Sequence, residues 1–154
     1  MAAPPERISH VGLAVSDMDT MTRFYAEGLG FEVGQSFQAG DDVAAVSEVE
    51  PPVKTTSRYL IKDGFRLELI GWDEPAVHGE PSTQRNQRGL THLALEVDSI
   101  ADTESKLLAV GGRTLPETRV MLDRSPLQIS VLMVTDPEGT RIELLQRHKD
   151  GERP

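Results

Sequence analysis

The sequence predicts an α+β fold built from two copies of one strand–helix–strand–strand–strand module. The first observation is that Ile8–Val15 and Leu90–Val97 align without a gap, with a histidine at the third position of each. The second is that Asp63–Ile70 and Glu138–Leu145 match at the turn glycine, the arginine and the glutamate. In each copy a stretch with helical periodicity follows the histidine segment. The chain is therefore interpreted as an internal duplication.

The first module is predicted to cover residues 8–73, and its opening strand is 8–15. A helix begins at the N-cap residues Ser16-Asp17 and ends at Gly28 or Gly30. Its buried face is predicted from apolar residues at helical spacing: Met18, Met21, Phe24, Tyr25 and Leu29. Further strands are predicted at 31–37, 57–62 and 65–72, and the last two are joined by the turn Asp63-Gly64. The acidic stretch 39–56, with its paired prolines, is predicted to be a long loop that covers a site or simply connects two strands.

The second module is predicted to cover residues 90–147, after a polar linker at 74–89 that Pro75, Gly79 and Pro81 interrupt. It repeats the order of elements: strand 90–97, a helix from Ser99 to Val110, and strands 113–122, 128–135 and 140–146. Residues 1–7 are predicted to form an arm, and the chain from His148 onward a frayed tail. Modules of about 65 residues are marginal alone, so a single domain over 8–147 is expected.

Composition excludes several classes of protein. The net charge of −9, without any cluster of Lys and Arg, argues against a nucleic-acid partner. The chain has no cysteine, so a metal would have to be held by His and carboxylate side chains. No apolar stretch reaches the length of a membrane span and no signal-peptide pattern opens the chain, so a cytoplasmic protein without a membrane contact is expected.

Candidate metal ligands emerge from the alternation of side chains along the strands. His10 shares one strand face with small residues, and Glu68 lies opposite the apolar face of its own strand. The second copy places His92 and Glu143 at the matching positions. Each half therefore offers one imidazole and one carboxylate, and two such halves make a nitrogen and oxygen set that suits a divalent transition metal.

These motifs resemble the vicinal oxygen chelate superfamily, which includes glyoxalase I, methylmalonyl-CoA epimerase, extradiol dioxygenases and bleomycin and fosfomycin resistance proteins. The resemblance covers about residues 8–147 and rests on the histidine segments, Phe24-Tyr25, Leu29-Gly30-Phe31, and Asp136-Pro137-Glu138-Gly139 with Ile142-Glu143-Leu144. It implies two βαβββ modules that form a cupped, half-open mixed-sheet barrel around one divalent ion per site, which could be Zn, Ni, Co, Mn or Fe. By this resemblance the metal ligands are His10, Glu68, His92 and Glu143.

The resemblance implies an isomerase, epimerase or lyase that transfers a proton next to a carbonyl through a metal-chelated enediolate or enolate. Its substrate would be a small molecule with adjacent oxygens, and a homodimer is expected. Glu143 is the expected principal base and Glu68 its partner. One alternative is an extradiol-type dioxygenase that uses His10, His92 and Glu143. Another is a non-catalytic drug-binding resistance protein.

Other polar and aromatic residues have less specific interpretations. Glu96, His78 and His148 are expected to be solvated, and Arg66 and Arg141 to contact a substrate carboxylate, to orient a glutamate, or to form ordinary salt bridges. Candidates for a pocket wall are Tyr59, Trp72, Phe37, Met121 and Met133, although most aromatic and Met residues in such a chain belong to the core.

Overall fold

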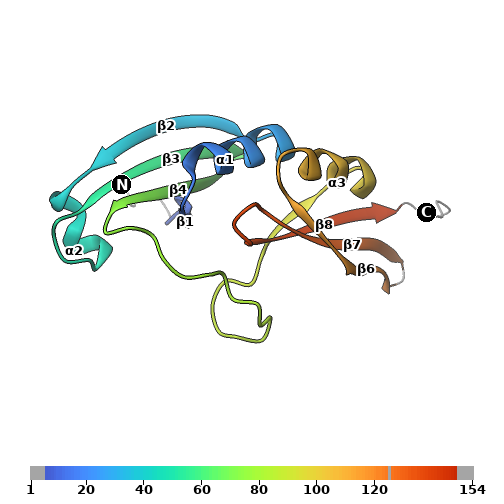
Figure 1. Cartoon of the computed structure of the whole chain (residues 1–154). Coiled ribbons are helices and arrows are strands. Elements are labelled where there is room, and N and C mark those ends of the chain that lie inside the picture. The colour runs from blue at the N-terminus through green and yellow to red at the C-terminus, as the bar shows by residue number, and fades with distance from the viewer. Residues whose placement is uncertain (1–5, 125, 149–154) are drawn as a thin grey trace. The chain divides into compact units, whose positions relative to one another are not determined.

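The computed structural model describes residues 6–124 and 126–148, and these residues form two four-stranded sheets of the same topology (Figure 1). The first sheet has the order β1-β4-β3-β2, with β1 Val11–Val15, β2 Glu32–Ala39, β3 Lys54–Lys62 and β4 Phe65–Glu74. The second has the order β5-β8-β7-β6, with β5 Leu93–Glu96, β6 Arg113–Arg124, β7 Leu127–Thr135 and β8 Arg141–His148. In each sheet the first pair is parallel and the others are antiparallel. The predicted α+β class, the duplication and the open mixed sheets are confirmed.

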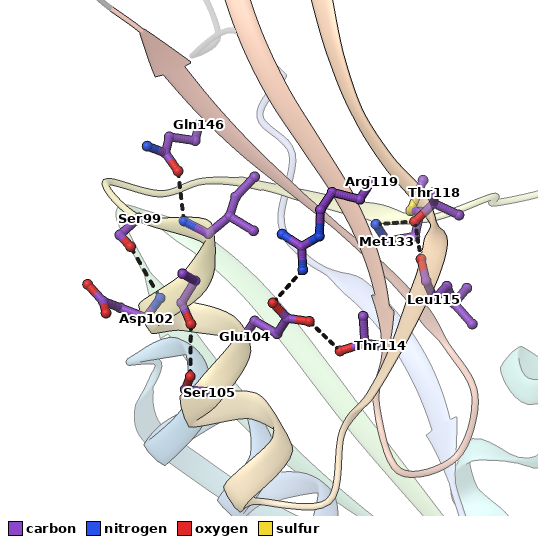
Figure 2. A network of polar contacts seen from close by, with 12 residues as sticks. Ser99, Asp102, Glu104, Ser105, Thr114, Leu115, Thr118, Arg119, Met133 and Gln146 are labelled. Carbon is purple, nitrogen blue, oxygen red and sulfur yellow. Dashed lines mark hydrogen bonds and ion pairs between the residues drawn. The ribbon is translucent and has the colours of Figure 1, made fainter. Parts of the chain in front are cut away.

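Two main helical segments accompany the sheets. The first is α1 Met18–Arg23, which continues into a π-helical turn, η1 Phe24–Gly28, and the second is α3 Ile100–Ala109. The Ser99 hydroxyl caps α3 by accepting a hydrogen bond from the Asp102 backbone N–H at 3.2 Å (Figure 2). No helix in the described ranges has the length and apolar composition needed to cross a membrane.

The helix of the first repeat belongs to the second compact unit. One unit holds the chain up to Met18 together with Gly30–Val77, and the other holds Asp19–Leu29 together with the chain from His78 onward. Within the second unit, Gly28 permits the helix of the first repeat to pack closely on α3, because a Cβ atom at this position would lie 2.7 Å from Leu107 Cδ2. The helical segment ends just before Gly30, whose φ of +73° favours glycine.

Buried aliphatic side chains on one face of each sheet determine which residues point the other way. Leu67 and Leu69 on β4 are fully buried, so Glu68 between them lies on the opposite face. Ile142 and Leu144 on β8 are likewise fully buried, with Glu143 between them on the opposite face. The predicted alternation is thus present in both repeats.

A polar network ties α3 to β6 and repairs an irregularity between β6 and β7 (Figure 2). Glu104 on α3 accepts hydrogen bonds from Thr114 at 2.7 Å and from Arg119 at 2.6 Å. The register of β6 on β7 breaks between Leu115 and Val120. There the Thr118 hydroxyl donates to the Leu115 carbonyl at 2.6 Å and accepts from the Met133 N–H at 2.8 Å, so the break leaves this backbone N–H satisfied.

Several predicted boundaries are wrong. β1 and β5 begin at Val11 and Leu93, so both histidines precede their strands, because pairing with β4 and β8 begins only there. The predicted loop 39–56 is largely structured: β2 reaches Ala39, a 3₁₀ turn η2 (Asp41–Val43) and a short helix α2 (Ala44–Ser47) follow, and β3 begins at Lys54. The Asp41 carboxylate stabilises this segment by accepting the Val53 N–H at 2.7 Å.

The ends of the predicted modules also differ from the structure. β4 continues to Glu74, into the predicted linker, because its pairing with β3 extends to Lys54. His148 is part of β8, where it pairs with Gln128 and its Nε2 lies 2.7 Å from the Ser130 hydroxyl, so it does not begin a frayed tail. The rest of the predicted tail (149–154) and residues 1–5 of the predicted arm lie outside the described residues.

Candidate metal centre

The first pair of candidate ligands lies where β1 begins beside β4. Gly12 is in register with Glu68, and His10 is two residues before Gly12 on the same side of the chain. His10 Nε2 lies 3.1 Å from Glu68 Oε2. The other ring nitrogen, Nδ1, lies 2.9 Å from the Ser9 hydroxyl. The imidazole is therefore oriented from both sides, with Nε2 directed at the carboxylate.

The second unit repeats this arrangement in detail. Ala94 is in register with Glu143, and His92 precedes Ala94 by two residues. His92 Nε2 lies 3.3 Å from Glu143 Oε2, and its Nδ1 lies 2.8 Å from the Thr91 hydroxyl. Two copies with independent side chains thus hold an imidazole and a carboxylate in the same relation.

Each pair has the chemistry and spacing of half a metal site. Imidazole and carboxylate donors bind a transition metal at about 2.1 Å, so two donors roughly 3 Å apart can share one ion at close to a right angle. A hydroxyl on Nδ1 is the kind of outer contact that fixes the orientation of a histidine ligand. Within residues 6–124 and 126–148, no group of three or more His, Asp and Glu residues forms a cluster fit for a metal. Each pair supplies two of the four donors that the sequence predicts, and the four-donor set itself stays a prediction.

The surroundings of Glu68 are aromatic and cationic. Tyr59 is directly opposite Glu68 across β3 and β4, and its hydroxyl hydrogen-bonds the carboxylate. The Tyr59 ring meets the His10 ring edge to face at 5.5 Å, and the Arg66 guanidinium lies 4.4 Å from its centroid. Phe37 contacts the same ring at 5.9 Å. Partial burial and then the charge of Glu68 raise the pKa of Tyr59, against the opposing effect of Arg66.

The surroundings of Glu143 differ at the matching position. Met133, not a tyrosine, stands opposite Glu143, and Leu115 follows on β6. Arg141 donates a hydrogen bond to the Gly139 carbonyl at 3.0 Å. The side chain of Glu143 is 22% exposed, compared with 13% for Glu68. The repeat therefore preserves the ligand pairs and changes the groups beside them.

The remaining candidates lie in varied places. Tyr59 and Phe37 adjoin the first pair and Met133 the second, as described above. Trp72 is opposite Thr55 on β3, and Met121 is exposed on β6 opposite Ser130. Glu96 forms an exposed ion pair with Arg147 at 2.8 Å. His78 is exposed in the linker.

Sequence reasoning missed Ser9 and Thr91, the hydroxyl residues that contact the two Nδ1 atoms. The signal was available, since both precede their histidine at the same position of the aligned segments. A hydroxyl before each of two aligned histidines favours an orienting role, because a hydrogen bond to one ring nitrogen fixes the direction of the other.

Comparison with known proteins gives a family match over most of the chain. The model of the Glyoxalase/Bleomycin resistance protein/Dioxygenase superfamily matches residues 7–144. An ethylmalonyl-CoA/methylmalonyl-CoA epimerase of Cereibacter sphaeroides is 25% identical over 144 residues, which cover 91% of this chain and 97% of that protein. A virulence protein of Salmonella typhimurium is 29% identical over 142 residues, covering 92% of this chain and 84% of that one.

Solved structures share the fold. A glyoxalase family protein from Bacillus cereus superposes with a TM-score of 0.81 over 97% of this chain and 99% of its own, at 18% sequence identity. At that identity the likeness concerns the fold alone. It agrees with the two mixed four-stranded sheets described above.

Proposed function

Because this chain belongs to the Glyoxalase/Bleomycin resistance protein/Dioxygenase superfamily, we propose that it is a metal-dependent isomerase, epimerase or lyase that moves a proton next to a carbonyl. Members of this superfamily typically bind a divalent metal ion and small-molecule substrates. The observation that carries the proposal is the repeated His–Glu pair, His10 with Glu68 and His92 with Glu143. The epimerase relative, at modest identity, agrees in reaction class.

The proposed ligand set consists of both pairs at one ion, contributed by one chain or by two copies. The donors of each pair are about 3 Å apart, as neighbours around one ion require. These four residues would hold the ion and would leave positions on it for substrate oxygens. This agrees with a substrate that carries adjacent oxygens.

The chemistry divides between the ion and the protein. A divalent ion held there supplies Lewis acidity, which stabilises the negative charge that develops on a substrate carbonyl oxygen. Glu143 is the proposed base that removes the proton from the neighbouring carbon, and Glu68 is the proposed partner that holds or returns a proton on the other side. Ser9 and Thr91 keep the two Nε2 atoms directed toward the carboxylates.

The alternatives fit the pairs less well. In a three-ligand dioxygenase Glu68 would not be a metal ligand, yet its carboxylate lies as close to the His10 ring as the Glu143 carboxylate lies to the His92 ring. A non-catalytic drug-binding protein would need neither pair, nor the hydroxyl behind each histidine. Both observations favour the four-donor isomerase, epimerase or lyase.

A homodimer is part of the proposal. Superfamily members often form dimers. The edge strands are β1 and β2 in the first sheet and β5 and β6 in the second, and among the described residues each pairs on one side only, so its other side needs covering or protection.

The first test is the metal content of the full-length protein after reconstitution with Co²⁺, Ni²⁺ or Zn²⁺. One shared centre requires one ion per chain, and His10→Ala and His92→Ala should each abolish binding. Two independent pairs would instead bind two ions per chain, and each variant would keep one. No binding by the wild type would overturn the proposal. His78→Ala is the matched control, because His78 is exposed in the linker and should leave the metal content unchanged.

The second test is proton exchange in D₂O with the loaded protein. Acyl-CoA thioesters, α-hydroxyketones and hemithioacetals each carry an acidic C–H next to a carbonyl or a masked carbonyl, and mass spectrometry would detect deuterium at that carbon. Exchange that depends on both metal and Glu143 supports the proposal. Oxygen consumption with a catechol and no exchange would establish the dioxygenase instead.

A further inference from the structure

A pocket of about 400 Å³ lies within the second unit, and one of its lining residues, Arg141, is two residues from Glu143 on β8. It is formed by the linker, the starts of β6 and β8, the end of β7 and the turn between β7 and β8. The residues that matter for its chemistry are Glu80, Arg113, Thr135, Glu138 and Arg141.

Three of these residues form one row across the sheet. Arg113 is in register with Thr135, and Thr135 is in register with Arg141. Arg141 and Glu143 are two residues apart on β8, so this row shares the face of Glu143 and is the next row along the sheet. Arg113 and Arg141 therefore flank Thr135 on the two neighbouring strands, one row from the proposed catalytic carboxylate of Glu143.

The first unit provides an internal comparison, because its corresponding row is Glu32, Ile61 and Arg66. Only the arginine is kept. Thr135 replaces an isoleucine and Arg113 replaces a glutamate, which reverses the charge at that position. In the first unit Arg66 stacks on Tyr59, a partner that the second unit lacks. The double-arginine row is thus a departure from the duplication and belongs to the second unit.

Two of the three polar side chains in this row have no partner among the described residues. Thr135 is 3% exposed, and among the described residues its hydroxyl oxygen is the buried side-chain polar atom without a hydrogen-bond partner. In the same described part of the chain Arg113 forms no ion pair or side-chain hydrogen bond, and Arg141 donates to the Gly139 carbonyl. Guanidinium groups with free donors match the planar, two-oxygen geometry of a carboxylate.

We propose that the Arg113–Thr135–Arg141 row binds the carboxylate of a small-molecule ligand. Glu80 and Glu138 line the same pocket, so a ligand here would have to be held by directed hydrogen bonds from the row and not by a general excess of positive charge. That this ligand is the substrate rests on the proposed function. Its carboxylate would then be anchored one row from Glu143, with the reacting carbon directed toward the His–Glu pair.

The test is a titration of the metal-free, ¹⁵N-labelled full-length protein with malonate, followed by ¹H–¹⁵N spectra that include the arginine Nε–H signals. The expected result is saturable shifts of Arg113, Arg141 and the Thr135 amide. Arg113→Gln should weaken malonate binding about tenfold or more, the loss expected for a charge-assisted hydrogen bond. Arg113→Glu, which installs the residue type of the first unit, should abolish it.

Controls separate this site from general charge effects and from the metal centre. Arg147 lies on β8, as Arg141 does, but it is on the surface and pairs with Glu96. Arg147→Gln should therefore leave malonate binding unchanged. Inorganic phosphate should bind more weakly than malonate, and equal or tighter binding of phosphate would overturn the assignment to a carboxylate. Shifts confined to other residues, or unchanged malonate affinity in Arg113→Gln, would overturn the site itself. The malonate titration uses metal-free protein, so its result does not depend on the metal centre. If the protein binds malonate but fails to bind metal in the separate reconstitution test, the carboxylate site stands and only the proposed function is refuted.

Discussion

The Tyr59 hydroxyl hydrogen-bonds the Glu68 carboxylate, whereas Met133 stands at the matching position beside Glu143. The two glutamates occupy equivalent strands and face equivalent histidines, yet only Glu68 has a neighbouring phenol at that cross-strand position. A hydrogen bond to a carboxylate restricts its rotation and lowers its tendency to leave a metal. The asymmetry therefore favours Glu68 as the steadier ligand and Glu143 as the mobile base.

Tyr59→Phe should weaken Co²⁺ binding several-fold, because loss of one hydrogen bond to a ligand costs about 0.5–1.5 kcal/mol. Competition with a coloured chelator measures the affinity, and the visible spectrum of bound Co²⁺ reports whether the ligand geometry has changed. Met133→Leu is the matched control, since it alters the equivalent position without removing a donor. Equal effects of the two variants would refute a specific role for the phenol.

Glu143→Gln should reduce metal-dependent proton exchange by about 10²–10⁴-fold, the usual contribution of a positioned base. Glu68→Gln should have the smaller effect on exchange and the larger effect on metal affinity. Measuring the exchange rate at saturating metal separates the two effects. If Glu68→Gln reduces proton exchange more than Glu143→Gln does, the roles assigned to the two carboxylates are reversed.

Tyr25 makes stability sensitive to alkaline pH. Its hydroxyl donates to buried Asp136 at 3.0 Å, and burial followed by the Asp136 charge raises the pKa of Tyr25 well above its ordinary value. Folding thus favours the protonated phenol, so its stabilisation is complete below about pH 10 and is lost as pH rises toward the folded-state pKa. Urea unfolding from pH 8 to 11 should show a steeper fall for the wild type than for Tyr25→Phe. Parallel curves would contradict this linkage.

Glu104 makes stability sensitive to acid. Burial raises the pKa of its carboxyl, but the hydrogen bonds from Thr114 and Arg119 outweigh burial, and the net pKa is lowered (Figure 2). The stabilisation is therefore present above the unfolded pKa of about 4.5 and is lost as pH falls through the folded value. Because Arg119 is half exposed, Glu104→Gln should cost only about 1 kcal/mol at pH 7.

The cost of Glu104→Gln should shrink as the pH falls through the lowered folded-state pKa of Glu104, because the wild-type carboxyl then becomes protonated as well. Urea unfolding at pH 7 and pH 3.5 measures both values. Glu96→Gln is the matched control, because the exposed Glu96–Arg147 pair should contribute less at either pH. A pH-independent cost for Glu104→Gln would mean that its packing, and not its charge, holds α3 to β6.

Sequence by itself determined the class of fold, the duplication and the two His–Glu sets. Period-two alternation of apolar and polar residues is a local property, so it could place Glu68 between Leu67 and Leu69 without knowledge of any partner strand. A different period, with apolar residues three or four positions apart, predicted both main helices. Ser9 and Thr91 could have been found from the alignment of the two repeats, because a hydroxyl residue precedes each aligned histidine, but only the structure shows their contacts with the ring nitrogens.

Only the tertiary structure decided where strands begin and which groups adjoin each carboxylate. Strand ends depend on where a partner strand stops pairing, as at Val11 and Leu93, and the chain around His10 does not encode that point locally. The pairing of Tyr59 with Glu68, and the row of Arg113, Thr135 and Arg141, depend on register between strands distant in sequence. Register is set by the packing of a whole sheet, which is why these neighbours could not be predicted from the residues alone.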